Sequence, residues 1–217
     1  EAVAAVSAAA VLNTGTPEEE KFRACLLRGQ AAQKLGQPVV LDPVGVGASP
    51  WRLERVEELL KNFTPSLLRV NPGEARALLH LESQSQGVDS PAALDSVQQG
   101  NLTLRLSREL KTAVLISGSE DFISNGTVLW KVSGGSSLMT QVTGTGCMLS
   151  VLCGVFAAVE PDVLTAAVTA AAFWKCCSRR AEAGCQGPGS FRTALLDAAG
   201  TLTAADCVGM ASAELLF

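Results

Sequence analysis

The sequence lacks several features that would assign it to common protein classes. It has one histidine, His80, and its seven cysteines form neither a CxxC pair nor a metal-ligand spacing with that histidine. An odd number of dispersed cysteines predicts free thiols in a reducing compartment, which favours the cytoplasm. The formal net charge of -4 comes from scattered residues with no basic cluster, which argues against nucleic acid as a partner.

Long apolar runs and linker sequences are also missing. Apolar segments such as Val151 to Val159 are too short to span a bilayer, and no secretory signal is visible, so no membrane association is expected. There are no internal repeats and no low-complexity linker. With 217 residues, 47% of them apolar, the chain is predicted to form one α/β domain over residues 1–217. Because it begins abruptly at Glu1, an upstream segment is expected to be missing.

Short β-rich runs alternate with longer helical patterns along the chain. Strands are predicted at 8–12, 38–41, 66–70 and 113–116, followed by a hairpin of 121–124 and 127–132 around Asn125-Gly126. Helices are predicted at 16–35 (with a capping box and Pro17 at its first position), 51–62, after Asn71, from Ser90, and at 101–111, 147–158, 163–183 and 190–199. Only helices are expected after residue 147. This alternation predicts a mainly parallel sheet covered by helices on both faces.

The segment from Val142 to Ser150 is the richest in chemical information. Two glycines flank a threonine, Cys147 follows, and helical spacing begins there. Glycines let the backbone approach a ligand, and the N–H groups at a helix start are free to bind an oxyanion. Cys147 lies where such a site would hold a reacting group. The structural alternative is a strand-to-helix turn with a buried cysteine.

Polar residues also follow the other predicted strands. Asp42 closes the second, Arg69, Asn71 and Glu74 lie at the end of the third, and Ser117 closes the fourth. Each has a structural interpretation alone, but ligands of parallel sheets bind at the carboxyl ends of the strands. Together they match phosphoryl transfer: Arg69 for phosphate oxygens, Asp42 and Glu74 for Mg²⁺, and the glycine turn for the transferred group. No Walker A motif is present, which disfavours a P-loop enzyme.

Three motifs resemble a known kinase family. Asn71-Pro72-Gly73-Glu74 resembles the Asn-x-x-Glu motif of ribokinase-like kinases, and Gly144-Thr145-Gly146-Cys147 is similar to their anion-hole motif. Within that superfamily, the run from Leu41 to Ser49, the Val-Thr-Gly-Thr-Gly-Cys form of the loop, and the segment from Gly187 to Phe191 resemble hydroxyethylthiazole kinase. The resemblance covers nearly the whole chain. It implies a ribokinase-like three-layer α/β/α fold.

The resemblance also implies an activity and an assembly. The activity is ATP-dependent phosphorylation of 4-methyl-5-(2-hydroxyethyl)thiazole in thiamine biosynthesis or salvage, with Mg²⁺, by a homotrimer whose thiazole pocket lies between subunits. The family's first strand and helix, which carry thiazole-contacting residues, have no counterpart in this sequence. The implied roles are ATP binding for Arg69, Ser117 and Asn71; metal and phosphate binding for Asp42 and Glu74; thiazole binding for Gly144; an anion hole for Thr145 and Gly146; and catalysis for Cys147.

The chemistry of Cys147 can be anticipated in outline. The thiol has an ordinary pKa of about 8.5, and a helix N-terminus lowers it, which predicts a thiolate near neutral pH. A primary alcohol is far less acidic than a thiol, so a thiolate is too weak a base to remove its proton. Cys147 is therefore expected to orient the hydroxyl more than to remove its proton.

Three other readings stay open at this point. A hydroxymethylpyrimidine or pyridoxal kinase also carries Gly-Thr-Gly-Cys but lacks the Asp-Pro-Val-Gly-Val-Gly run. The dehydratase that repairs hydrated NAD(P)H would have an aspartate at position 147. A non-catalytic subunit of ribokinase fold has no need to keep Asp42, Arg69, Glu74 and the glycine loop together.

Overall fold

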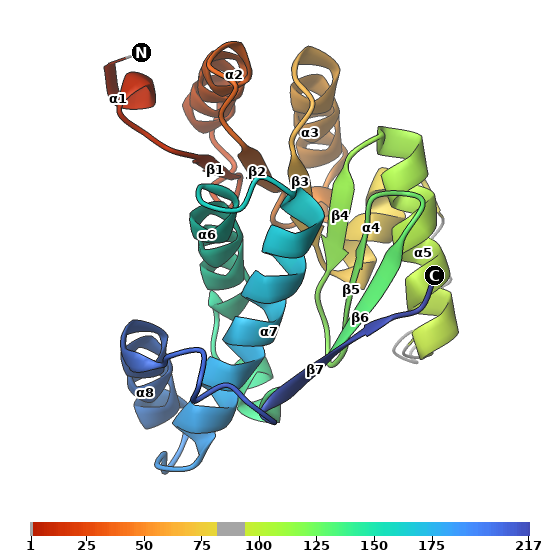
Figure 1. Ribbon diagram of the computed structural model, residues 1–217. Helices are drawn as coiled ribbons and strands as arrows, with labels where there is room; N and C mark the ends of the chain where they lie inside the picture. The colour runs from red at the N-terminus through yellow and green to blue at the C-terminus, as the bar shows by residue number, and fades with distance from the viewer. Residues whose placement is uncertain (1, 82–93) are drawn as a thin grey trace.

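The computed structural model describes residues 2–81 and 94–217, and a seven-stranded sheet lies at its centre (Figure 1). Each strand lies beside the next one in the sequence, in the order β1 to β7. Strands β1 to β4 pair in parallel, and β5, β6 and β7 add antiparallel pairs, so β6 again points the same way as β1 to β4. The predicted mainly parallel sheet is confirmed. The strands are β1 (Ala10–Asn13), β2 (Val39–Asp42), β3 (Leu67–Val70), β4 (Ala113–Ile116), β5 (Asp121–Ser124), β6 (Leu129–Gly134) and β7 (Ala211–Leu215).

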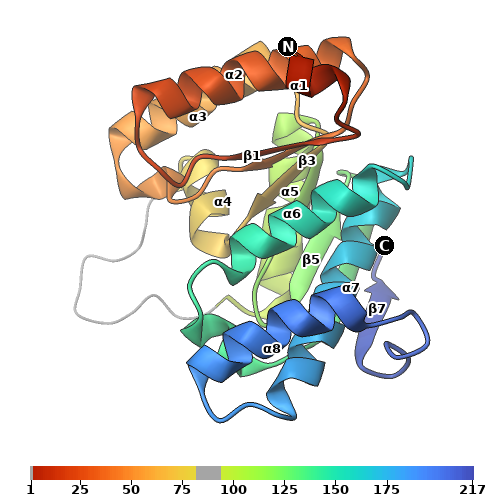
Figure 2. The same cartoon turned by 90° about the vertical axis from the view of Figure 1, so that its left-hand side faces the viewer.

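Helices that connect the parallel strands cover one face of the sheet. Crossovers between parallel strands are right-handed, so strands added successively in one direction place their helices on the same side. These helices are α2 (Glu19–Lys34), α3 (Pro50–Asn62), α4 (Pro72–Leu78) and α5 (Ser96–Leu110), and a short α1 (Ala2–Ala5) precedes β1. Figure 2 shows α2 and α3 on one side of the strands and α6 and α7 on the other.

The opposite face is covered by α6 (Thr145–Ala157) and α7 (Val163–Glu182), with α8 (Pro188–Thr201) packed on α7. Helix α6 crosses β1 and β2, and α7 crosses the strands from β4 to β7. Gly154 brings α6 close to the sheet, because a Cβ at this position would clash with Val11 on β1. The three layers are the predicted α/β/α arrangement. Within the described residues, no helix is both long and apolar enough to cross a membrane.

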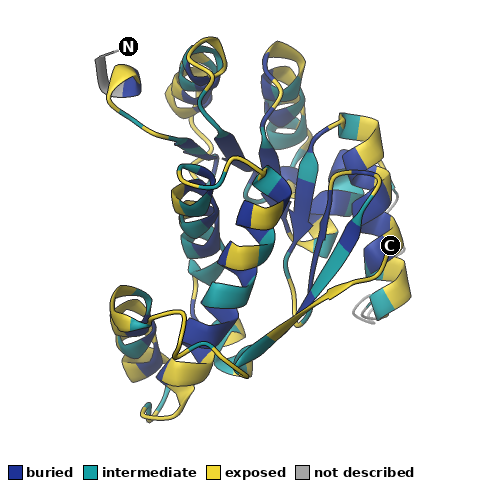
Figure 3. Cartoon of the chain, viewed as in Figure 1, coloured by how far each residue is buried: buried dark blue, intermediate teal, exposed yellow. Residues whose placement is uncertain are grey.

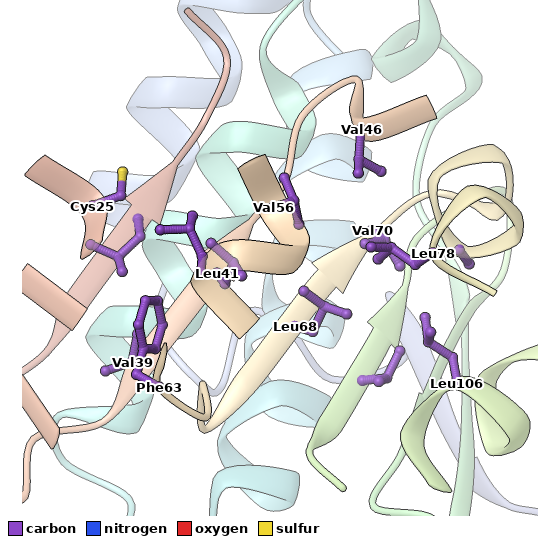
Figure 4. Packing of buried hydrophobic residues seen from close by; sticks show 14 of the residues in the cluster. Cys25, Val39, Leu41, Val46, Val56, Phe63, Leu68, Val70, Leu78 and Leu106 are labelled. Atoms are coloured by element: carbon purple, nitrogen blue, oxygen red, sulfur yellow. The ribbon is translucent and has the colours of Figure 1, made fainter. Parts of the chain in front are cut away.

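Alternation along the central strands fills two separate hydrophobic cores. Val39 and Leu41 pack with α2 and α3, together with Val56 and Phe63 (Figure 4), whereas Val40 packs in the core under α6 and α7. All residues of β2 and β3 are buried (Figure 3). Side chains on a strand alternate between the two faces of the sheet. The faces of the core residues therefore also determine which face each strand-end residue points to.

Two local predictions are wrong. The capping box predicted at residues 16–19 does not form, because the Glu18 N–H bonds to the Thr16 carbonyl and α2 begins only at Glu19, without a side-chain cap. The prediction that only helices follow residue 147 misses β7. This strand pairs antiparallel with β6, yet all its residues after Ala211 are exposed (Figure 3). It therefore lacks the alternation of buried and exposed positions that is typical of a half-buried strand. The helix start predicted at Ser90 lies outside the described residues.

Candidate active site

Four polar side chains meet at the carboxyl end of the sheet. Asn13 ends β1, Asp42 ends β2, Arg69 lies near the end of β3, and Ser117 follows β4. Each stands two residues after a side chain that packs in the α6–α7 core, so all four face that layer. Those preceding residues are Val11, Val40, Leu67 and Leu115. The parallel pairing places Asn13 beside Asp42. The predicted gathering of strand-end residues is therefore present, and Asn13 joins it.

The carboxylate of Asp42 is fully buried, with one oxygen engaged and one open. Its Oδ2 accepts hydrogen bonds from Asn13 Nδ2 at 2.9 Å and from Ser150 Oγ on α6 at 2.8 Å. Its Oδ1 lies 3.6 Å from Arg69 Nη1 and has no hydrogen-bond partner among the described residues. Buried polar atoms rarely remain unpaired, so this oxygen is suited to a cation or a ligand donor.

Arg69 is buried rather than paired on the surface. It donates from Nη2 to Ser117 Oγ, and its Nε has no partner among the described residues. The guanidinium packs directly against Gly146, where a Cβ would come within 2.6 Å of Nη1 and 2.7 Å of Cζ. Real Cβ atoms do not approach that closely. Glycine at position 146 is thus a requirement for the observed place of Arg69.

The glycine turn forms the start of α6. Gly144 is the N-cap residue in the left-handed conformation (φ 96°), and no side chain caps this helix end. The first N–H groups of the helix are therefore free to bind an anion. Thr145 is held on two sides: its hydroxyl donates to the Met139 carbonyl at 3.1 Å, and its own carbonyl accepts from Trp174 Nε1 at 3.1 Å.

A cavity of about 620 Å³ opens beside this turn. Its size suits a small-molecule ligand. The residues predicted to contact ATP or to form the anion hole all line it: Arg69, Asn71, Ser117, Thr145 and Gly146. The remaining predicted site residues, Asp42, Glu74, Gly144 and Cys147, lie outside this lining. Asp42 is connected to it through Arg69.

Cys147 lies beside Asp42 and Asn13 at the start of α6, partly exposed. Burial raises the pKa of the Cys147 thiol, and the negative charge of Asp42 adds to this, while Asn13 and the Arg69 charge act in the opposite direction. The predicted lowering of this pKa by the helix N-terminus is wrong in sign. Desolvation and a buried neighbouring carboxylate outweigh the helix end.

Glu74 and Asn71 form a capping box at the start of α4. The Asn71 side chain accepts from the Glu74 N–H, and Glu74 Oε2 accepts from the Asn71 N–H, both at 2.9 Å. The other oxygen, Oε1, accepts from the Gly45 N–H at 2.8 Å and so ties the loop after β2 to α4. Burial raises the pKa of Glu74, against the effect of these N–H groups and of Arg69. Glu74 therefore caps the start of α4 and also holds the loop after β2.

Sequence reasoning missed a buried ion pair on the cavity wall. Lys175 Nζ on α7 lies 3.3 Å from Asp121 Oδ2 at the start of β5, and both residues line the cavity. The signal was available, because Lys175 is the only charged residue from Val163 to Ser178, and a lysine inside an apolar helix needs a partner. Asn13 was also detectable, since it ends β1 as Asp42 ends β2. Ser150 had no comparable signal.

Known proteins of one kinase family are similar to this chain. Residues 1–205 match the model of the hydroxyethylthiazole kinase family. The chain is 39% identical over 195 residues to a hydroxyethylthiazole kinase of Moorella thermoacetica, covering 90% of this chain and 72% of that protein. It is 42% identical over 190 residues to one of Listeria monocytogenes, covering 87% and 70%.

Solved structures give the same result. A hydroxyethylthiazole kinase from Pyrococcus horikoshii superposes with a TM-score of 0.89 at 30% identity, covering all of this chain and 80% of that one. A pyridoxal kinase from Staphylococcus aureus in complex with AMP-PCP has a TM-score of 0.59 at 17% identity, covering 78% and 63%, and shares the fold alone. The chain therefore belongs to the hydroxyethylthiazole kinase family.

Proposed function

We propose that this chain transfers the γ-phosphoryl group of ATP to the hydroxyl of 4-methyl-5-(2-hydroxyethyl)thiazole. The observation that carries the proposal is the contact between Gly146 and Arg69, which sets an uncapped helix start and a buried guanidinium side by side. Backbone N–H groups and an arginine fork both bind phosphate oxygens. The two hydroxyethylthiazole kinases that are 39% and 42% identical to this chain support the thiazole alcohol as the acceptor.

The cavity is assigned to the nucleotide. Arg69 and Ser117 provide a cation and a hydroxyl in the lining, and Thr145 and Gly146 beside Arg69 provide free N–H groups. These groups match the phosphates of ATP. Asn71 lines the same cavity, but its side-chain oxygen already accepts from the Glu74 N–H, so its remaining amide donors are the groups available to ATP.

Mg²⁺ fits the open oxygen of Asp42. That oxygen is buried, accepts no hydrogen bond from the described residues and lies 3.6 Å from Arg69 Nη1, whereas both oxygens of Glu74 already accept N–H groups, which favours contact of Glu74 with the ion through water. In the part of the chain that the structure describes, no group of three or more His, Cys, Asp or Glu side chains is placed to hold a metal. A site with one or two carboxylates is typical of Mg²⁺, which takes its other ligands from water and phosphate. When bound, the ion would neutralise charge on the phosphates.

The acceptor hydroxyl is assigned to the side of Cys147 and Gly144. A Cβ at Gly144 would meet nothing within 4 Å, so this face of the turn is open to a ligand. Since burial and Asp42 raise the pKa of Cys147, the thiol stays protonated near neutral pH and can donate or accept one hydrogen bond. We infer that Cys147 orients the hydroxyl and that positioning and charge stabilisation supply most of the rate.

The test is product formation. The chain is incubated with ATP, Mg²⁺ and either the thiazole alcohol or hydroxymethylpyrimidine, and the phosphorylated product is identified by mass spectrometry. Product from the thiazole alcohol is expected. Product from the pyrimidine alone would instead assign the chain to a pyrimidine kinase, and product from neither would favour a binding role.

We further propose a homotrimer in the cytoplasm. Val151 and Val155 on α6 are 53% and 57% exposed and Val159 just beyond it is 80% exposed, which makes an apolar stripe at a spacing of four residues. Such a stripe fits contact with a second copy. The seven free cysteines support a reducing compartment.

A further inference from the structure

The Lys175–Asp121 pair holds the main chain of Gly118 and Ser119 on the cavity wall. The ammonium group of Lys175 donates to the Ser119 carbonyl at 3.0 Å and to the Gly118 carbonyl at 3.5 Å. Asp121 Oδ1 accepts from the Gly118 N–H at 2.9 Å, while its Oδ2 faces Lys175. The main chain directly after Ser117 is therefore fixed through its donor and its acceptors at once.

The ammonium group has no donor left for a ligand. A lysine carries three N–H donors, and here the two carbonyls and the Asp121 carboxylate are three acceptors within reach. The side chains of Lys175 and Asp121 are only 7% and 6% exposed. Although both line the cavity, the geometry is that of a group that fixes a loop rather than one that binds a substrate.

Stability alone does not explain such a pair. Burying two charges costs solvation energy that their attraction barely returns, and an apolar pair of similar volume is often as stable. What an apolar pair cannot do is hold a peptide group by hydrogen bonds. The retained charges are thus best explained by the position of the Ser117–Ser119 loop.

The same part of α7 also holds two further loops of the cavity. Trp174, next to Lys175, donates to the Thr145 carbonyl in the glycine turn. One turn further along, Ser178 Oγ accepts from the Ser136 N–H at 3.1 Å. A Cβ at Gly135 would lie 3.0 Å from Ser178 Oγ and 3.3 Å from the Lys175 side chain, so this loop passes directly over α7. Residues 174–178 therefore contact three segments that line the cavity: the Ser117–Ser119 loop, the loop at Gly135 and Ser136, and the glycine turn.

We propose that Lys175, with Asp121 as its counter-ion, is a positioning residue for nucleotide binding. It fixes the Ser117–Ser119 loop, and through Ser117 it sets the hydrogen bond that orients Arg69 toward the cavity. The inference rests on the proposed function, in which this cavity binds ATP.

Two variants separate positioning from folding. Lys175→Met alone leaves the buried Asp121 without its partner and is expected to lower the melting temperature. Adding Asp121→Asn removes the unpaired charge and keeps an acceptor for the Gly118 N–H, so the double variant is expected to melt near the parent. Lys61→Met is the matched control, since the side chain of Lys61 on α3 is 77% exposed and its ion pair with Glu57 spans 4.0 Å.

The measurements are steady-state kinetics in both substrates and calorimetric titration with ADP. In the double variant, the KM for ATP and the Kd for ADP are expected to rise at least about tenfold, as for a lost charge-assisted hydrogen bond, while the KM for the thiazole alcohol stays within about twofold. If recovery of the melting temperature also restores ADP binding, Lys175 is merely structural and the inference is overturned. An equal rise in both KM values would overturn it as well. If the parent itself binds no ADP, the proposed function fails, and the inference with it.

Discussion

The contact between Gly146 and Arg69 gives the sharpest prediction, the effect of Gly146→Ala. The new Cβ would come within 2.6 to 2.7 Å of guanidinium atoms, whereas atoms in ordinary contact lie about 3.5 Å apart. The guanidinium therefore has to retreat by about 1 Å. That shift breaks its hydrogen bond to Ser117 and moves it away from the phosphate position that we assign to it.

The size of the loss follows from one charge-assisted hydrogen bond. Such a bond contributes about 1.5 to 3 kcal/mol, which corresponds to a factor of about 10 to 150 in kcat/KM for ATP. The fold should be affected little, because alanine in a helix is favoured over glycine by roughly 0.5 to 1 kcal/mol and the clashing atoms belong to the end of a flexible side chain. The assay is initial rate against ATP concentration at saturating thiazole alcohol, with thermal unfolding measured in parallel.

Gly189→Ala is the matched control for this experiment. Gly189 is the second residue of α8, as Gly146 is of α6, each helix follows a glycine N-cap, and a Cβ at Gly189 meets nothing within 4 Å. Its kinetics should equal those of the parent. If Gly146→Ala behaves like Gly189→Ala, Arg69 does not bind the phosphates from its observed place, and the reasoning fails.

Four further predictions concern other parts of the site and surface. Asp42→Asn should lower kcat by at least about 100-fold, with partial recovery at high Mg²⁺, as measured by initial rates across a Mg²⁺ series; parental rates at low Mg²⁺ would exclude Asp42 as a ligand. Cys147→Ala should reduce turnover far more than ADP binding, whereas Cys147→Ser keeps a hydroxyl and most of the turnover; equal loss in both would contradict an orienting role. Because the pKa of Cys147 is raised, the thiolate forms only as the pH rises above the ordinary thiol value of about 8.5, so iodoacetamide should label it slowly at pH 7 and faster in alkali, as followed by peptide mass spectrometry. Val155→Asp should shift the species seen in sedimentation velocity from trimer to monomer, and an unchanged trimer would place the interface elsewhere.

The parts of the fold set by local pattern were predictable. The residues of β4 match the predicted 113–116 segment, and the Asn125-Gly126 turn correctly indicated the hairpin of β5 and β6. The strand-end cluster followed from one topological rule, since parallel strands bring Asp42, Arg69 and Ser117 to one edge.

What escaped prediction depends on tertiary contacts. Lys175 acquires its partners only when α7 packs across the sheet. One of them, Ser119, lies 56 residues earlier in the chain. The pKa of Cys147 on α6 depends on Asp42, which ends β2 in a distant part of the sequence. Strand β7 forms because the edge of β6 is available for pairing. Its own residues are mostly exposed, so their burial does not indicate a strand.

The two glycines on the inner side of α6 have a consequence for binding kinetics. Gly146 packs against Arg69 and Gly154 packs against Val11, so the helix is seated on the sheet at both its first turn and its third. A helix held in this way cannot shift its position to close over an incoming nucleotide. The anion site that we propose at its N-terminus would then be formed before the ligand arrives, so ordering it would cost little on binding. Association should then be limited by encounter and by the loops around the cavity, and not by a rearrangement of α6.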